Sequence, residues 1–153
     1  RDDIDLLAAG VPCQPFSIAG GGLGQYDERN MFPEAVRAIV ALRPKAVLIE
    51  NVKGLLRPNF REYMDFLCLE ISFPEISRQP NEEWKSHYKR LQSLAEKNWA
   101  GGLRYHVYCH VLNAADYGVP QWRERVFIVA FRSDIAVDWS PPAPSQTLSS
   151  ASM

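Results

Sequence analysis

The sequence lacks a strong net charge, a membrane-spanning apolar run and a paired set of cysteines. Its 153 residues carry a formal net charge of −1, so no overall positive field indicates a nucleic-acid partner and only local arginines could bind one. No apolar run is long enough to span a bilayer, and no signal peptide is recognisable. The three cysteines form no even-numbered framework, which favours a reducing compartment. We therefore expect a soluble, intracellular protein.

One cysteine stands in an unusual local setting. The apolar run from Ile4 to Ala9 stops at Gly10, which predicts a buried strand of an α/β sheet. Cys13 follows between two prolines, and each proline holds the residue before it in an extended conformation. This places Cys13 just past the carboxyl end of a strand, where open α/β sheets bind their ligands. The alternative is a small buried core residue, since no metal-ligand spacing surrounds Cys13.

A glycine-rich segment follows this cysteine. Three consecutive glycines and a fourth occupy Gly20 to Gly24, which predicts a mobile loop. The spacing differs from Gly-x-Gly-x-x-Gly, and no helix opens directly behind it, so a phosphate cradle is a weak interpretation. We expect a hinged lid that closes over a site. A merely flexible surface loop is the alternative.

The next elements predict a βαβ unit. Apolar residues recur at helical spacing from Phe32 to Leu42, and the run from Lys45 to Val52 predicts a second buried strand. Strand, helix and strand in this order imply parallel pairing with a right-handed crossover. Cys13 and Glu50, 37 positions apart, should therefore face the same crevice at the carboxyl ends of adjacent strands.

The remainder predicts two more helices and a hairpin. Helical periodicity covers 60–71 and 82–99, which we interpret as a crossover helix and an inserted helical segment within about 57–102. Runs at 104–112 and 125–132 predict two antiparallel strands joined by a long loop. The expected fold is thus α/β, with a parallel βαβ unit and a C-terminal antiparallel hairpin. Residues 133–153, rich in proline and serine, predict a linker.

Four motifs occur along the chain in a fixed order. They are Pro12-Cys13-Gln14, Asp27-x-Arg29, Glu50-Asn51-Val52 and Gln121-x-Arg123-x-Arg125, the last preceded by Asn-Ala-x-Asp-Tyr-Gly-x-Pro over 113–120. In this combination the chain resembles the DNA cytosine-5 methyltransferases. The resemblance extends from about Asp5 to Arg132, apart from the inserted segment. Glu-Asn-Val alone would have no weight, whereas the four together are highly specific.

The resemblance implies a catalytic set. Cytosine C5 is a poor nucleophile until a group adds to C6, and a thiolate suits that addition, a role that falls to Cys13. Glu50 would protonate or hydrogen-bond N3 as electron density builds on the ring. Arg125 would reach the cytosine O2, while Arg123 braces the closed loop or a phosphate. We expect these two arginine side chains to diverge to opposite faces. The alternatives are a salt-bridged strand-end carboxylate for Glu50 and a surface charge cluster for the arginines.

The resemblance also implies substrate contacts. The carbonyl of Val11 would accept a hydrogen bond from the cytosine amino group. Ser17 and Arg29 match loop positions that meet the DNA backbone once the base has been flipped out of the helix. The expected substrate-binding residues are therefore Val11, Gln14, Ser17, Arg29, Asn51 and Gln121.

The family's methyl donor is S-adenosylmethionine, and most of its site is expected to be absent. Family members hold it with a glycine-rich turn after the first strand and an acidic residue after the second, and neither precedes Asp5. Only Pro12 and Phe32 stand at expected donor positions. We therefore expect a partial Rossmann-like methyltransferase sheet whose first strands are missing, as in a fragment, a truncated product or one subunit of a split enzyme. Residues 1–132 would be the catalytic half, and 133–153 would lead towards a recognition region.

The expected partners follow from this. They are double-stranded DNA and the missing segments, supplied covalently or by a complementary subunit. The strand Ile4 to Ala9 would be an exposed apolar edge, which invites self-association. Two alternative functions stay open. The first is methylation of a tRNA cytosine, although that branch usually shows threonine where Ser17 stands. The second is a catalytically silent binding module.

Overall fold

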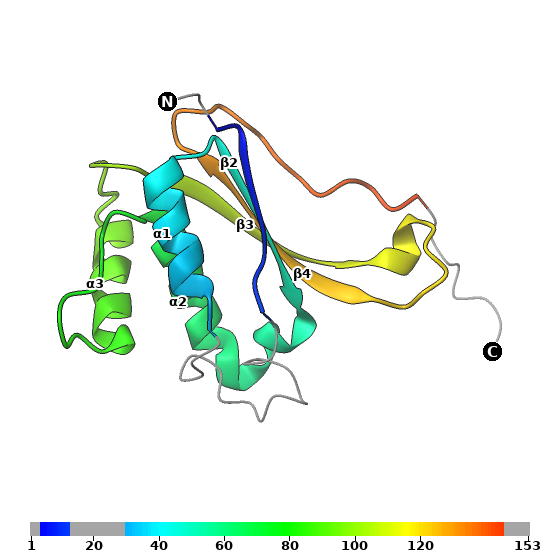
Figure 1. The fold of residues 1–153 in the computed structure, drawn as a ribbon, viewed down its shortest axis with the longest axis horizontal. Coiled ribbons are helices and arrows are strands. Elements are labelled where there is room, and N and C mark those ends of the chain that lie inside the picture. The colour runs from blue at the N-terminus through cyan, green and yellow to red at the C-terminus, as the bar shows by residue number, and fades with distance from the viewer. Residues whose placement is uncertain (1–3, 13–29, 146–153) are drawn as a thin grey trace.

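The fold is a four-stranded mixed sheet with three helices, in the residues that the structure describes (Figure 1). The structure is a computed structural model and describes residues 4–12 and 30–145. The strands are β1 (Leu6–Gly10), β2 (Ala46–Val52), β3 (Tyr105–Asn113) and β4 (Glu124–Arg132), and the helices are α1 (Phe32–Leu42), α2 (Arg61–Ser72) and α3 (Trp84–Glu96). Short 3₁₀ segments lie at η4 (Lys53–Leu56), η5 (Pro58–Phe60) and η6 (Ala114–Tyr117).

The strand order is β1-β2-β4-β3, and it confirms the predicted fold class. β1 and β2 are parallel and are joined through α1, whereas β4 runs antiparallel to both β2 and β3. Gly10 pairs with Glu50, so the carboxyl ends of the two parallel strands meet at one edge of the sheet. The predicted parallel pairing of these two strands is therefore confirmed, whereas the prediction that Cys13 faces the same crevice as Glu50 concerns a residue outside the described ranges.

α1 matches its predicted bounds, Phe32 to Leu42. The Asn30 side-chain oxygen accepts a hydrogen bond from the Phe32 N–H at 3.2 Å, and Pro33 occupies the first turn. The helix ends at Arg43, which adopts a left-handed conformation with φ of 49° ahead of Pro44. These signals at both ends define a helix of 11 residues that carries the chain from β1 to β2.

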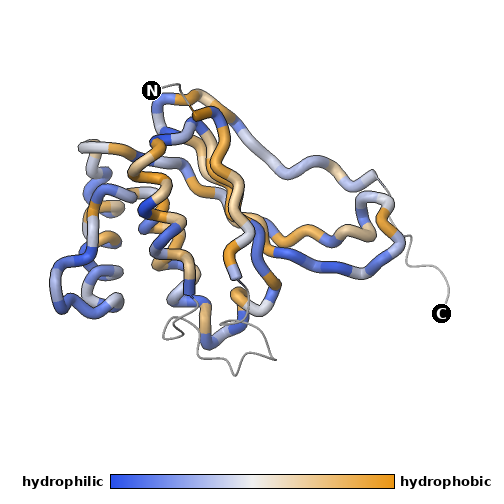
Figure 2. The backbone as a smooth tube through the Cα atoms, in the orientation of Figure 1, coloured by the Kyte–Doolittle hydropathy of each residue, from blue (hydrophilic) through white to orange (hydrophobic). Residues whose placement is uncertain are grey.

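The core lies between the sheet and its helices. Side chains alternate along β2, with Val47 and Ile49 buried in the core while Glu50 lies on the opposite face. α2 packs against α1, α3, β3 and β4. Figure 2 shows apolar residues concentrated along the central strands and polar residues on α3 and the loop before it. α3 is fixed by buried Leu91 and by ring contacts between Phe66 and Trp84 at 5.5 Å.

The segment after β4 folds back along the sheet without forming a helix or strand, up to residue 145 (Figure 1). Trp139 contacts the rings of Tyr108 at 5.6 Å and His110 at 5.4 Å, which alternate with the core-facing residues of β3. Further along, the Tyr117 hydroxyl donates a hydrogen bond to the Pro142 carbonyl at 2.9 Å. This part of the predicted linker is therefore packed on the hairpin.

None of the helices in the described ranges has the length and apolar character required to cross a membrane.

Candidate functional site at the carboxyl ends of β1 and β2

One buried asparagine side chain links the carboxyl ends of the two parallel strands. The Asn51 side-chain N–H donates to the Val11 carbonyl at 3.2 Å, and its oxygen accepts from the Val52 N–H at 2.8 Å. Asn51 and Val11 are 2% and 7% exposed, so the hydrogen bond between them is buried, whereas the bond from Val52 is partly buried. This fixes the chain at Val11 immediately before Pro12 and Cys13. The structure thus brings Asn51 to the exit of β1 rather than to an open cavity.

Several predicted residues lie outside the described ranges. They are Cys13, Gln14, Ser17, Arg29 and the predicted lid from Gly20 to Gly24. Their roles stay predictions.

Glu50 and Arg125 form an ion pair on the sheet face opposite the helices. The Glu50 Oε1 and Arg125 Nε atoms are 2.9 Å apart, on neighbouring strands β2 and β4. The Arg125 Nη1 also donates to the Glu124 carbonyl at 2.8 Å. The side chains are 40% and 24% exposed, so each keeps a surface open to solvent or a ligand. This pair brings together two residues that the sequence assigned to one pocket.

A cavity of about 350 Å³ adjoins this pair, and most of its exposed lining is apolar. Its lining residues come from β2, from the β3–β4 hairpin and from the segment after β4; they are Glu50, Leu112, Ala114, Tyr117, Arg123, Arg125, Phe127 and Pro142. The prediction that the two arginines diverge is wrong, because both line this cavity and residues two apart along a strand share a face.

Five of these lining residues were not predicted as site residues from the sequence: Leu112, Ala114, Tyr117, Phe127 and Pro142. The pairing of the strands could have indicated two of them as cavity residues, because Phe127 pairs with Glu50 and Leu112 pairs with Arg125. No sequence pattern indicates Pro142, because the segment that carries it lacks periodicity and reaches the cavity through a contact between residues far apart in the sequence.

Asn113 braces the loop that carries Arg123. Its side-chain oxygen accepts from the N–H groups of Ala115 at 3.2 Å and Arg123 at 2.9 Å. The Ala114 N–H donates to the Arg123 carbonyl at 3.0 Å, which closes the loop at its base. Gln121 is exposed at the tip of this loop and is not among the cavity-lining residues.

The family model of the C-5 cytosine-specific DNA methylases matches residues 1–73 and 80–152. The chain belongs to this family.

Curated relatives agree with that assignment. The Type II methyltransferase M.NgoMIV of Neisseria gonorrhoeae is 38% identical over 144 residues, covering 94% of this chain and 37% of the relative. M.AquIA of Picosynechococcus is 39% identical over 131 residues, covering 85% and 44%. The chain thus spans about two fifths of the relatives it matches. Among solved structures, the Entamoeba histolytica methyltransferase EhMeth is 18% identical with a TM-score of 0.42, covering 83% of this chain and 32% of that one.

The methylase family uses S-adenosylmethionine, but the described residues do not fit a complete donor site. Pro12 is exposed at the exit of β1 and is available for contact. Phe32 is 1% exposed and belongs to the hydrophobic core, so its side chain is not open to a ligand. Neither residue lines the cavity beside Glu50.

The two cysteines of this methylase chain that the structure describes are poor nucleophiles. Burial raises the pKa of the Cys68 thiol to about 12. Cys109 is exposed on β3, yet partial desolvation also raises its pKa. A thiol with a raised pKa carries little thiolate at neutral pH, and the thiolate is the reactive form.

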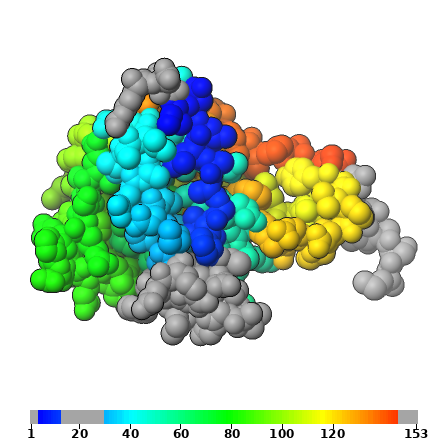
Figure 3. Space-filling model, in the orientation of Figure 1, coloured from blue at the N-terminus to red at the C-terminus, as the bar shows by residue number. Residues whose placement is uncertain are grey.

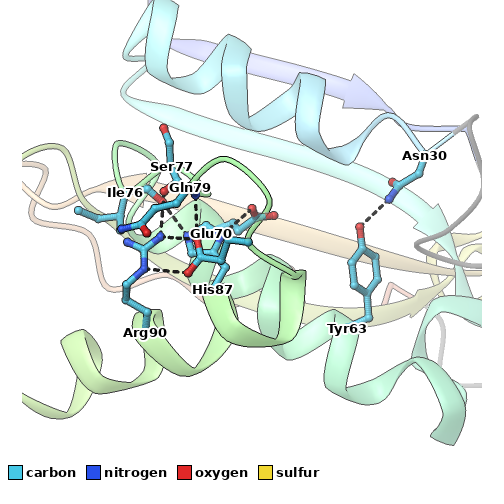
Figure 4. A network of polar contacts seen from close by, with 9 residues as sticks. Asn30, Tyr63, Glu70, Ile76, Ser77, Gln79, His87 and Arg90 are labelled. Atoms are coloured by element: carbon cyan, nitrogen blue, oxygen red, sulfur yellow. Dashed lines mark hydrogen bonds and ion pairs between the residues drawn. The ribbon is translucent and has the colours of Figure 1, made fainter.

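A second polar cluster lies away from this site, between α2, α3 and the loop that joins them (Figure 4). His87 is 1% exposed, and its Nε2 lies 2.8 Å from the Ile76 carbonyl. Among the described residues its Nδ1 has no hydrogen-bond partner, and it lies 3.7 Å from a carboxylate oxygen of Glu70. Burial is the largest cause of both pKa shifts, raising the pKa of Glu70 to about 7 and lowering the pKa of His87. The residues that the structure describes contain no cluster suited to a metal ion.

Proposed function

We propose that this chain is the catalytic half of a DNA cytosine-5 methyltransferase that acts on a cytosine flipped out of double-stranded DNA. The observation that carries the proposal is the placement of Glu50 and Arg125. They form an ion pair beside a cavity, at the carboxyl end of β2, and the adjacent β1 leads directly to Cys13. Residues 1–132 would form the catalytic portion, and 133–153 would lead towards a recognition region.

The chemistry assigns one role to each residue. The Cys13 thiolate adds to C6 of the cytosine, forming a sulfur–carbon bond and moving electron density towards N3 and C5. Glu50 acts at N3 and stabilises this density, and Arg125 holds O2 with its planar guanidinium. When bound, S-adenosylmethionine would supply the methyl group at C5 and leave as S-adenosylhomocysteine. Loss of the C5 proton to water would then allow the sulfur–carbon bond to break and release the thiolate.

Positioning of the base depends on the strand exits. A carbonyl oxygen has two lone pairs. One lone pair of the Val11 carbonyl accepts the hydrogen bond from Asn51, and the other would accept a hydrogen bond from the cytosine amino group. Asn51 would therefore act through Val11 rather than on the substrate. Arg123, at the mouth of the same cavity, would bind a DNA phosphate or brace the closed loop. Gln14, Ser17, Arg29 and Gln121 remain proposed substrate contacts.

A covalent trap tests the proposal. The gene product that contains this chain is incubated with S-adenosylmethionine and a DNA duplex carrying 5-fluorocytosine, which blocks loss of the group at C5. We expect an adduct that mass spectrometry locates on Cys13. An adduct on another residue, or full activity of Cys13→Ser, would overturn the assignment of the nucleophile. A parallel reaction with tRNA carrying 5-fluorocytosine separates the substrates, since trapping on RNA alone would contradict the DNA proposal.

A further inference from the structure

The tip of the β3–β4 hairpin presents an exposed aromatic residue beside the cavity. Trp122 is 72% exposed, the highest value among the large apolar residues that the structure describes. It immediately precedes Arg123, which lines the cavity. In Figure 3 the hairpin tip forms an arm that projects from the body of the molecule. Trp122 therefore offers a large indole face to solvent, next to Arg123 in the sequence.

The loop that carries Trp122 is held at several points. Asn113 accepts hydrogen bonds from both Ala115 and Arg123, and the Val119 N–H donates to the Ala114 carbonyl at 3.2 Å. The Tyr117 hydroxyl ties the same loop to Pro142. A partner that binds Trp122 therefore meets a largely ordered loop, which lowers the entropic cost of association.

The surrounding charges favour an anionic partner. Two carboxylates near the tip are paired, Glu124 with Lys53 at 2.6 Å and Glu50 with Arg125 at 2.9 Å, while Asp116 in η6 adds a negative charge to the same loop. Arg123 is exposed, and among the described residues no carboxylate forms an ion pair with it. An unpaired guanidinium beside an open indole combines a group that binds phosphate with a surface on which bases stack.

A protein partner fits this tip less well. A stable protein interface buries about 800 Å² on each side. Besides Trp122, the only large apolar residue that the described tip exposes is Val119, at 46%. Two side chains fall well short of such an interface, whereas stacking of one indole on a base needs only the indole itself.

We infer that Trp122 is a DNA-contacting residue whose indole stacks on a base next to the flipped target cytosine, with Arg123 on the adjacent phosphate. This inference rests on the proposed function, because it takes the cavity beside Glu50 as the site of the target base. It assigns the hairpin tip a part in holding the opened duplex, since flipping exposes the faces of the neighbouring bases.

Binding measurements on the gene product that contains this chain test the inference. The probe is a short labelled duplex bearing the cytosine that bisulfite sequencing finds methylated, with an abasic site at that cytosine to open the stack. We expect Trp122→Ala to raise the Kd by about tenfold or more, and Trp122→Phe to stay within about threefold of wild type because it retains a stacking surface. DNA should quench wild-type tryptophan fluorescence more than that of Trp122→Phe.

The control is Leu42→Ala, which removes a 42% exposed apolar side chain at the far end of α1 and should leave the Kd unchanged. Thermal melting checks that each variant folds, which is expected because Trp122 is outside the core. A wild-type protein that methylates and binds DNA, with Trp122→Ala within about twofold in Kd, would overturn this inference alone. A wild-type protein that neither methylates nor binds DNA would overturn the proposed function together with it.

Discussion

Glu50 and Asn51 are neighbours in one motif and lie on opposite faces of β2. Glu50 reaches the cavity and pairs with Arg125. Asn51 turns into the interior and holds the Val11 carbonyl. Under the proposed function, this alternation would give Glu50 a part in the chemistry and Asn51 a part in positioning.

The Glu50 assignment predicts a large loss of turnover. In the gene product that contains this chain, Glu50→Gln should lower the methylation rate by about 10²–10⁴-fold, the usual contribution of an acid–base group. Arg125→Lys should also be damaging, because a point donor does not replace the planar guanidinium fork. Single-turnover methylation of DNA measures both. An unchanged rate for Glu50→Gln would contradict its role at N3, and Lys53→Met, which removes a nearby charge outside the cavity lining, is the control.

The Asn51 assignment predicts a loss of stability as well as activity. Asn51→Ala leaves the Val11 carbonyl and the Val52 N–H without this partner, at a cost of about 1–3 kcal/mol for a buried polar group. Urea unfolding of the chain should show this change in free energy of unfolding. Gln121→Ala, at an exposed position, should stay within about 0.5 kcal/mol of wild type. Equal stability of the two variants would show that Asn51 does not hold the strand exit.

At the scale of elements, α3 and α2 pack together beside a partly buried carboxyl, that of Glu70. Glu70 faces His87 at 3.7 Å, and Arg78 is the charge that opposes the shift in its pKa. Because the pKa of Glu70 is raised from 4.5 to about 7, the folded state retains a proton that the unfolded state releases between these values. The contribution of protonated Glu70 to the free energy of unfolding is therefore fully present below pH 4.5, and it is lost as the pH rises through 7.

Glu70→Gln should remove this pH dependence. At pH 8 the variant should be more stable than wild type by at most about 3 kcal/mol, since one pKa unit corresponds to about 1.4 kcal/mol. At pH 4, below the unfolded pKa of 4.5, the two should be nearly equal. Urea unfolding at both pH values measures the difference. Both proteins retain His87. Because the pKa of His87 is lowered in the folded state, its contribution to the free energy of unfolding increases as the pH rises to 6.5. A constant difference between the two proteins would contradict the shift assigned to Glu70.

The sequence predicts the elements better than their contacts. The spacing of apolar residues and the proline signals give α1 its observed bounds, and the βαβ order gives the parallel pairing of β1 and β2. The same patterns do not predict that α3 packs its Trp84 on Phe66 of α2, because periodicity identifies an apolar face but not its partner. The contact between Tyr117 and Pro142 is likewise absent from any local pattern.

At the scale of the whole molecule, the sheet leaves β1 at its edge. Within the described residues β1 pairs only with β2, and Leu6 on this strand is 54% exposed. An apolar edge strand is a template for another strand, so it invites self-association of the chain when nothing covers it. In a longer methyltransferase the same edge would be available to further strands of the sheet.

The arrangement predicts that these 153 residues alone neither bind S-adenosylmethionine tightly nor methylate DNA. Open sheets bind a ligand at the point where strand order reverses, between two halves, and among the described strands β1 has a neighbour on one side only. Pro12 is the one expected donor contact with an exposed side chain, since Phe32 is buried in the core. Calorimetric titration of the monomeric chain should therefore show no micromolar binding. A dissociation constant near 1 μM, about −8 kcal/mol, would mean that this half of the sheet holds the donor by itself.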